Sequence, residues 1–354
     1  MRASLIRFCL TCGLISATVV SILTGCGSDS DGGNNNTGLS YTGSNNPAQI
    51  SAANAGPLAD SAITVDDSSA VFKPAAADGQ SAKVEGSKTE TSGGDFSPLE
   101  FAVFIRDYLL PVSKSKLVED NVERRSISAI NVNETLSCSS GSLSLSGQVN
   151  DNYIGTVNAT FNNCQIEGFT ANGTMTLSIA AFDQSQFEIT DATFTFSSLT
   201  VTGSNFNANT SGTVRIQQSV ANNTITITLN SVIDEQVSGK QFKAENMVVV
   251  VTFDNIVFPS NASESVTGRV FDSVEGYFDI QTIEPLSYSS TLLDYPDSGG
   301  EIILTGASNQ KIRVIANPNN TVTLELDLDA DGAYELSATM TWDELKTEDG
   351  SNFS

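Results

Sequence analysis

Four acidic side chains near the carboxyl end of the chain have types and a spacing that could hold a metal ion. Asp327, Asp329 and Asp331 occupy alternate positions, Gly332 follows them, and Glu335 lies three residues further on. Carboxylate oxygens at alternate positions can surround a hard cation, and a glycine allows the chain to turn sharply around it. The sequence therefore makes these four carboxylates candidate ligands of a calcium ion.

The run Asp327-Leu-Asp-Ala-Asp-Gly332 resembles the start of an EF-hand calcium loop. It departs from that pattern at position 12, where Ala338 stands in place of the glutamate that binds calcium through both oxygens. The flanking residues alternate as strands do, whereas helices flank an EF-hand. Two interpretations stay open: a calcium site in a β-hairpin that uses backbone oxygens and Glu335, or an acidic hairpin turn without a metal.

The chain has no histidine and five cysteines. Without histidine there is no Ser–His or Cys–His catalytic pair and no imidazole-ligated metal. Cys138 and Cys164 are the pair that remains after the first 26 residues. In an oxidising compartment such a pair is expected to form a disulfide, and two buried free thiols are the alternative.

The composition is strongly acidic, with a net charge of −24 from 41 acidic and 17 basic residues. Nucleic-acid binding depends on Lys and Arg side chains that displace counterions from phosphates, so we expect no nucleic-acid partner. Hydrophobic residues make up 39% of the chain, which is enough for a large core. An enzyme stays undecided and no catalytic residue is predicted, because so many carboxylates form pairs whatever the function.

The first 25 residues have the features of an export signal. Arg2 and Arg7 precede an apolar stretch from Leu10 to Leu23, and the string Leu23-Thr-Gly-Cys26 ends it. This string resembles the lipobox of bacterial lipoproteins. The resemblance implies that the signal peptide is cut before Cys26 and that Cys26 is acylated, so that its lipid holds the chain at a membrane. An ordinary secretory signal is the alternative.

In bacterial lipoproteins, an aspartate after the cysteine retains the protein in the inner membrane. Gly27 occupies that position here, so the resemblance implies attachment to the outer membrane, on its periplasmic or cell-surface face. The body of the chain is also similar in style to uncharacterised proteobacterial β-rich lipoproteins. That similarity rests on the Cys138–Cys164 pair, the Asp-x-Asp-Gly turn and the terminal Thr-Trp-Asp-Glu-Leu, and it implies no activity.

Three segments are expected. Residues 1–25 form the signal peptide, residues 26–96 a lipidated low-complexity tether, and residues 97–354 a β-rich domain led by a helix. The tether is too polar to bury surface up to about residue 45, and residues 46–64 can form a short helix that Gly56-Pro57 interrupts. Ser97-Pro-Leu-Glu100 is a capping box with proline at the first helical position, and it predicts an amphipathic helix limited by Pro111.

From about residue 135 to residue 345, apolar and polar residues alternate. Thr224–Asn230 and Val322–Asp329 each place apolar side chains on one face and polar ones on the other. This period predicts antiparallel strands with one wet face, separated by turn clusters such as Asn150-Asp-Asn152. We therefore expect an all-β chain: an antiparallel meander of a dozen or more strands, curled as a barrel or half-barrel around the Ser97 helix. A stacked sandwich is the alternative.

These features predict a membrane-tethered extracytoplasmic lipoprotein that acts as a structural or interaction module of the cell envelope, with an envelope protein as partner. The alternative is a carrier of an apolar ligand in a concavity of the sheet, and a carbohydrate-acting enzyme is a third possibility. The interior distinguishes the first two. A core filled by Phe161, Phe194, Phe196 and Met247 favours a structural role, whereas a cavity of roughly several hundred Å³ favours a carrier.

Overall fold

The computed structural model describes residues 38–63, 130–166, 169–184, 188–203, 206–255, 261–289, 296, 299–345 and 347–354. The signal peptide, Cys26 and the helix predicted from Ser97 lie outside the described residues. The described part consists mainly of β-strands, with two α-helices and one 3₁₀ turn. The prediction of an all-β chain is therefore confirmed.

The two α-helices lie near the two ends of the described chain: α1 spans Ala52–Ile63 and α5 spans Trp342–Leu345. The 3₁₀ turn, η3, spans Ala307–Asn309. The strands, in chain order, are β1 (Ile130–Ser137), β2 (Ser142–Val149), β3 (Gly155–Ile166), β4 (Phe169–Asp183), β5 (Glu188–Thr202), β6 (Asn207–Ser219), β7 (Thr224–Glu235), β8 (Gln241–Phe253), β9 (Asn261–Asp272), β10 (Gly276–Glu284), β11 (Leu286–Ser289), β12 (Glu301–Thr305), β13 (Lys311–Asn317), β14 (Thr321–Asp327) and β15 (Leu336–Thr341).

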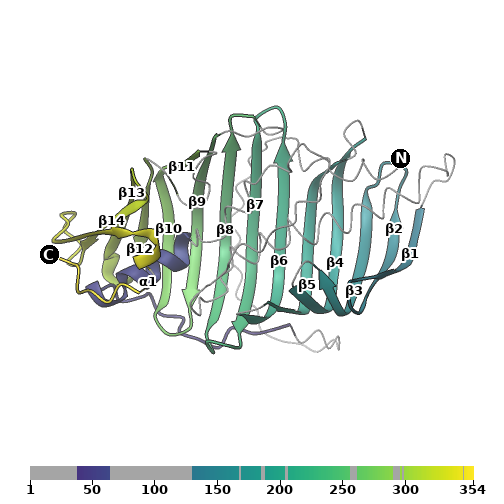
Figure 1. Cartoon of the computed structure of the whole chain (residues 1–354), viewed down its shortest axis with the longest axis horizontal. Coiled ribbons are helices and arrows are strands. Elements are labelled where there is room, and N and C mark those ends of the chain that lie inside the picture. The colour runs from purple at the N-terminus through teal and green to yellow at the C-terminus, as the bar shows by residue number, and fades with distance from the viewer. Residues whose placement is uncertain are drawn as a thin grey trace, which may run out of the picture.

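Strands that follow one another in the chain are neighbours in a single antiparallel sheet of 15 strands. The order runs from β1 to β10 and then from β12 to β15, while β11 pairs with β9 instead. Figure 1 shows the strands side by side along the long axis, with β1 at one end and the last strands at the other. The predicted meander of a dozen or more strands is confirmed.

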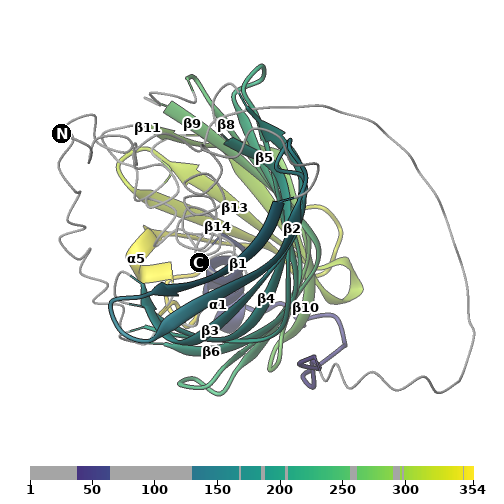
Figure 2. The same ribbon diagram turned by 90° about the vertical axis from the view of Figure 1, so that its right-hand side faces the viewer.

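The sheet is curved but not closed, as Figure 2 shows in a view along its length. Among the described residues, the end strands β1 and β15 pair only with β2 and β14. A closed barrel, one of the two predicted shapes, is therefore wrong, and a sandwich of two sheets is excluded as well. Shifts of register mark bulges, for example between Phe161 and Cys164. Bulges bend strands and increase their twist, so the sheet can curve while its ends stay apart.

One face of the sheet is buried. In β7, Ile225, Ile227 and Leu229 are at most 4% exposed, whereas the threonines between them are half-buried. This alternation confirms the two faces predicted for Thr224–Asn230. The inward-facing apolar side chains along the whole sheet belong to one contiguous core. Each buried Val, Leu, Ile, Phe or Met side chain stabilises the fold by about 1.5–3 kcal/mol relative to an exposed one, so the length of the sheet is itself a source of stability.

The other face of the sheet carries hydroxyl and amide groups that join neighbouring strands. Thr176 Oγ1 donates to Asn158 Oδ1 at 2.9 Å, between β4 and β3. Gln148 Nε2 donates to Asn131 Oδ1 at 2.8 Å, between β2 and β1. Cross-strand pairs of this kind contribute roughly 0.2–1 kcal/mol each. This is the polar, solvent-facing side of the sheet that the alternating sequence predicts.

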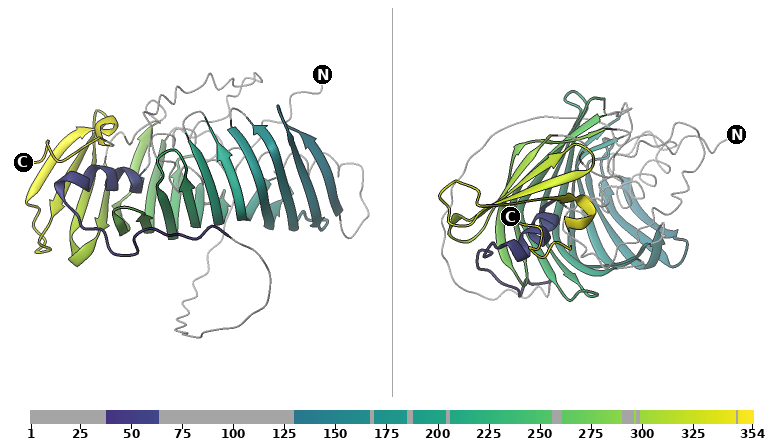
Figure 3. Two further views of the ribbon diagram at one scale, coloured as in Figure 1. Left: turned by 90° about the horizontal axis from the view of Figure 1, so that it is seen from below. Right: turned by 60° about the vertical axis from the view of Figure 1, so that its left-hand side comes forward.

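Helix α1 packs at the carboxyl end of the sheet, against β13, β14 and α5 (Figure 3). Its inner face is formed by Ala55, Leu58, Ala59 and Ala62, which are at most 1% exposed. A short helix is therefore present within residues 46–64, as predicted. Among the described residues, no helix combines the length and the apolar character that crossing a membrane requires.

The expected interruption at Gly56-Pro57 does not occur, because Pro57 lies inside α1. Proline has no N–H to donate to the carbonyl four residues earlier, here that of Ala53, and its ring crowds that carbonyl, so α1 contains Pro57 at the cost of one helical hydrogen bond. Gly56 has a packing role. A Cβ at this position would lie 2.5 Å from the Leu345 carbonyl oxygen and 2.6 Å from Glu348 Cβ. The glycine thus allows α1 to approach the C-terminal segment closely.

Residues 38–51, here called the N-terminal strap, lie along the sheet between the start of the described chain and α1 (Figure 3). The Thr42 amide donates to Gln241 Oε1 at 2.8 Å, and the Ala48 amide donates to the Tyr277 carbonyl at 2.7 Å. Composition assigns the first part of this segment to a flexible tether. The structure instead attaches it to the sheet through hydrogen bonds and through the ring of Tyr41, which packs on Phe271 with the ring centroids 5.6 Å apart.

Candidate metal centre

The four carboxylates predicted to bind calcium lie on the hairpin between β14 and β15. Strand β14 ends at Asp327, β15 begins at Leu336, and the register places Leu326 opposite Leu336. The connecting loop passes through left-handed backbone positions at Ala330 (φ 62°) and Gly332 (φ 92°). Glycine adopts such positions without steric cost, which explains its place in the motif. Strands flank the site, as the alternation predicts.

The four carboxylates converge at this hairpin. One carboxylate oxygen from each of Asp327, Asp329, Asp331 and Glu335 lies within 4.8 Å of the others. Asp327 is buried and the other three are exposed. Because calcium binds oxygens at about 2.3–2.6 Å, two ligands on opposite sides of the ion are about 5 Å apart. The fold therefore brings the whole predicted ligand set within the coordination sphere of one ion.

Hydrogen bonds inside the loop hold three of the carboxylates in place. Asp329 Oδ1 accepts from the Asp331 amide at 3.1 Å, and Asp331 Oδ1 accepts from the Ala333 amide at 2.7 Å. Glu335 Oε2 accepts from the Leu328 amide at 2.9 Å. Each of these bonds uses one oxygen and leaves the second oxygen of that carboxylate for another ligand.

Asp327 differs from the other three because it is fully buried. Its Oδ2 accepts from the Gly332 amide at 3.2 Å, whereas its buried Oδ1 has no hydrogen-bond partner. Lys311 lies opposite Asp327 in the register, but no ion pair joins the two in the described part of the chain. A buried acceptor without a partner costs roughly 1–3 kcal/mol, and more when it is charged. A cation bound to this oxygen would offset that cost.

The other basic side chain of β13, two residues beyond Lys311, is already paired with other carboxylates. Arg313 on β13 pairs with Glu301 at 2.6 Å and with Glu325 at 3.1 Å. These carboxylates raise the pKa of the Arg313 guanidinium, chiefly through the hydrogen bond to Glu301. The same guanidinium lies 5.7 Å from the centre of the Tyr334 ring, and burial raises the pKa of the Tyr334 phenol. Arg313 is thus committed to other carboxylates and does not neutralise the hairpin.

Gln310, which belongs to no recognisable sequence motif, connects this hairpin to the N-terminal strap. Its Nε2 donates to the Leu328 carbonyl at 2.9 Å. Its Oε1 accepts from the Ile50 amide at 3.0 Å and from Gln49 Nε2 at 2.6 Å. Gln310 is only 8% exposed. A single glutamine before a strand forms no pattern, so the sequence contains no signal that would have revealed this link.

No family model matches this chain, and comparison with curated proteins and with solved structures finds no similar protein. Ala338, at position 12 of the loop, is buried on the inward face of β15 and supplies no side-chain ligand. The departure from the EF-hand pattern is thus real, and any further ligands would be backbone oxygens or water.

Cys138 and Cys164 form a disulfide, with their Cα atoms 5.3 Å apart. The bond joins the turn after β1 to β3, next to the bulge that begins after Phe161. Backbone bonds reinforce the connection, since the Gln165 amide donates to the Ser140 carbonyl at 2.8 Å. The predicted pairing is confirmed, and the alternative of two free thiols is excluded.

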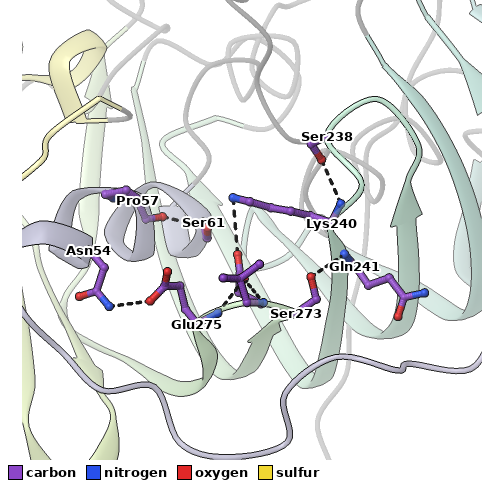
Figure 4. A network of polar contacts seen from close by, with 10 residues as sticks. Asn54, Pro57, Ser61, Ser238, Lys240, Gln241, Ser273 and Glu275 are labelled. Carbon is purple, nitrogen blue, oxygen red and sulfur yellow. Dashed lines mark hydrogen bonds and ion pairs between the residues drawn. The ribbon is translucent and has the colours of Figure 1, made fainter.

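A second group of charged side chains, at the turn between β9 and β10, has a structural role. Asp272 Oδ1 accepts from the amides of Val274 at 2.7 Å and Glu275 at 3.0 Å, and its Oδ2 lies 3.8 Å from Lys240 Nζ. Figure 4 shows Asn54 of α1 pointing toward Glu275, to which it donates at 2.7 Å. These contacts fix the turn and tie α1 to it.

Proposed function

We propose that this chain is an exported lipoprotein, anchored to a membrane through Cys26, that serves as a structural or interaction module of a cell envelope. The observation that carries the proposal is the string Leu23-Thr-Gly-Cys26 at the end of an apolar run. Stable anchoring needs more than one acyl chain, which a multiply acylated cysteine supplies. Gly27 after the cysteine favours the outer membrane, on either its periplasmic or its cell-surface face.

The Cys138–Cys164 disulfide supports export. Structural disulfides persist in oxidising compartments such as the periplasm or the cell surface, whereas cytosolic thiols are kept reduced. The strongly acidic composition agrees with an extracytoplasmic protein that has no nucleic-acid partner. Both features are independent of the lipobox, so they add weight to it.

The core supports a structural role over that of a carrier. Phe161, Phe194, Phe196 and Met247 are each at most 2% exposed and belong to one contiguous hydrophobic core. A carrier of an apolar ligand would keep a hollow between such side chains. The long open sheet presents its polar face along the whole body, and we propose an envelope protein as the partner of that face.

We also infer that the helix predicted from Ser97 packs against the inward face of β2–β8. The inward-facing side chains of these strands are buried, although α1 and α5 make their main contacts with β13, β14 and β15. The predicted helix offers Phe101, Phe104 and Leu109 as a matching apolar face. Under this proposal, residues 97–110 exchange amide hydrogens slowly and Phe104→Asp destabilises the sheet. Fast exchange in that segment of the folded protein would contradict it.

Mass spectrometry of the membrane fraction, from cells that produce the full chain, tests the proposed lipid anchor at Cys26. We expect an amino-terminal peptide that begins at Cys26 and carries acyl chains, and we expect Cys26→Ser to lose the acylation and to leave the membrane fraction. A native chain that begins at Met1, or a membrane-free chain with an unmodified amino terminus, would refute the anchor. Organic extraction of the purified protein tests the role, since a stoichiometric apolar ligand would favour the carrier.

A further inference from the structure

We propose that the hairpin between β14 and β15 binds one calcium ion through Asp327, Asp329, Asp331 and Glu335. The proposal goes beyond the envelope role and does not depend on the lipid anchor. One carboxylate oxygen from each of these residues lies within 4.8 Å of the other three. A loop selected only to turn would have no reason to bring four like charges together, because like charges at such distances repel one another.

The buried Asp327 separates this hairpin from an ordinary exposed acidic turn. Its Oδ1 is buried and has no hydrogen-bond partner, although it belongs to the group of side chains whose oxygens converge. An acidic turn that needs no ligand would expose this carboxylate to water or pair it with a cation. Lys311 and Arg313 are the basic residues of β13. Among the described residues, Lys311 lies opposite Asp327 in the register without forming an ion pair with it, and Arg313 is held by Glu301 and Glu325. The unused oxygen is therefore best explained as a ligand.

The donor set selects the class of metal. It contains only carboxylate oxygens, which suit hard cations and do not favour the softer metals that histidine and cysteine bind. Oxygens that spread over nearly 5 Å fit calcium, whereas magnesium requires ligands at about 2.0–2.1 Å in a strict octahedron. Ala338 removes the bidentate ligand of the EF-hand loop, so we expect the weak affinity of extracellular calcium modules, with a Kd of about 10⁻⁴–10⁻³ M.

Calcium binding at this hairpin should also stabilise the N-terminal strap, through a chain of hydrogen bonds. Glu335 holds the Leu328 amide, and the Leu328 carbonyl accepts from Gln310, which in turn accepts from the Ile50 amide. An ion bound to Glu335 therefore orders Leu328, whose carbonyl accepts the hydrogen bond from Gln310 Nε2. The Ile50 amide should exchange more slowly in calcium than in its absence.

The test uses the purified protein, stripped with a chelator and then titrated with calcium chloride alone. Isothermal titration calorimetry should find one site, and saturating calcium should raise the Tm by about 5 °C. Asp327→Asn and Asp329→Asn should each weaken binding at least tenfold. In chelator both variants should be at least as stable as the wild type, because each removes one of four mutually repelling charges. Asp151→Asn, which removes a charge from the exposed turn between β2 and β3, is the matched control and should bind normally.

Two results would overturn the proposal. One is the absence of both binding heat and a Tm shift in the wild type at 10 mM calcium chloride, about ten times the weakest expected Kd. The other is a variant pattern in which Asp329→Asn binds as tightly as Asp151→Asn. Should Asp327→Asn fail to fold, Asp329→Asn and Asp331→Asn still decide the question, because both residues are exposed. Equal binding of magnesium would refute the assignment to calcium.

Discussion

Reduction of the Cys138–Cys164 disulfide should lower the free energy of unfolding by about 3.5 kcal/mol at 25 °C, the value that the chain-entropy model gives for a loop of this length. The two cysteines are 26 residues apart, and the segment between them contains all of β2 and most of β3. Cys164 is fully buried but Cys138 is only partly buried, so the Cys138 thiol can move away from Cys164 on reduction while the rest of the native state changes little. Most of the effect should therefore come from the greater freedom of the unfolded chain.

Urea unfolding of the oxidised and the reduced wild type measures this difference directly. The double variant Cys138→Ser/Cys164→Ala is the control, and reductant should not change its unfolding curve. Hydrogen exchange should show that the loss of protection is greatest in β1, β2 and β3, the strands that the bond joins. Equal unfolding free energies before and after reduction, with both thiols shown to be free, would refute the loop-closure reasoning.

Three further substitutions test the packing and the electrostatics. Gly56→Ala should destabilise the fold by about 1–3 kcal/mol, because its Cβ would lie 2.5 Å from the Leu345 carbonyl oxygen, and urea unfolding would measure the loss. Burial raises the pKa of Tyr41 to about 12, from an ordinary 10.0. Stability should therefore fall between these two pH values, where the unfolded phenol loses its proton first, and Tyr41→Phe should flatten that part of a pH series of thermal melts. Gln310→Ala leaves the Ile50 amide without its acceptor, so hydrogen exchange at this amide should speed up severalfold.

Each of these expectations has a control and a contrary outcome. Gly38→Ala is the control for the first substitution, since nothing lies within 4 Å of its Cβ, and an equal effect at both glycines would contradict the packing argument. A pH profile that Tyr41→Phe leaves unchanged would show that another group causes the loss of stability. Unchanged exchange at Ile50 in Gln310→Ala would show that the strap is held without this side chain.

The strands could be predicted from the sequence because a sheet with one buried face imposes a period of two on the residues themselves. Thr224–Asn230 shows that period without knowledge of any neighbour. Closure of the sheet could not be predicted in the same way. It depends on the sum of twist and bulges, such as the shift between Phe161 and Cys164, which exists only in the register between two strands. The role of Gly56 was missed for a similar reason, since its contact with Leu345 comes from the other end of the chain.

The candidate metal site and the strap also show which features a sequence pattern can predict and which depend on the folded structure. The ligand set could be predicted because its members lie close together in the sequence at alternate positions, but the burial of Asp327 depends on how the loop folds over it. Composition assigns the first part of the strap to a tether because it counts apolar side chains, whereas backbone hydrogen bonds, the contact of Tyr41 with Phe271 and the buried Ala48 and Ile50 hold the strap. Gln310 joins the two, since one amide group satisfies both the Leu328 carbonyl and the Ile50 amide. If the strap or the hairpin moved away from Gln310, one polar atom of its buried amide would lose its hydrogen-bond partner, so the strap and the hairpin should loosen together.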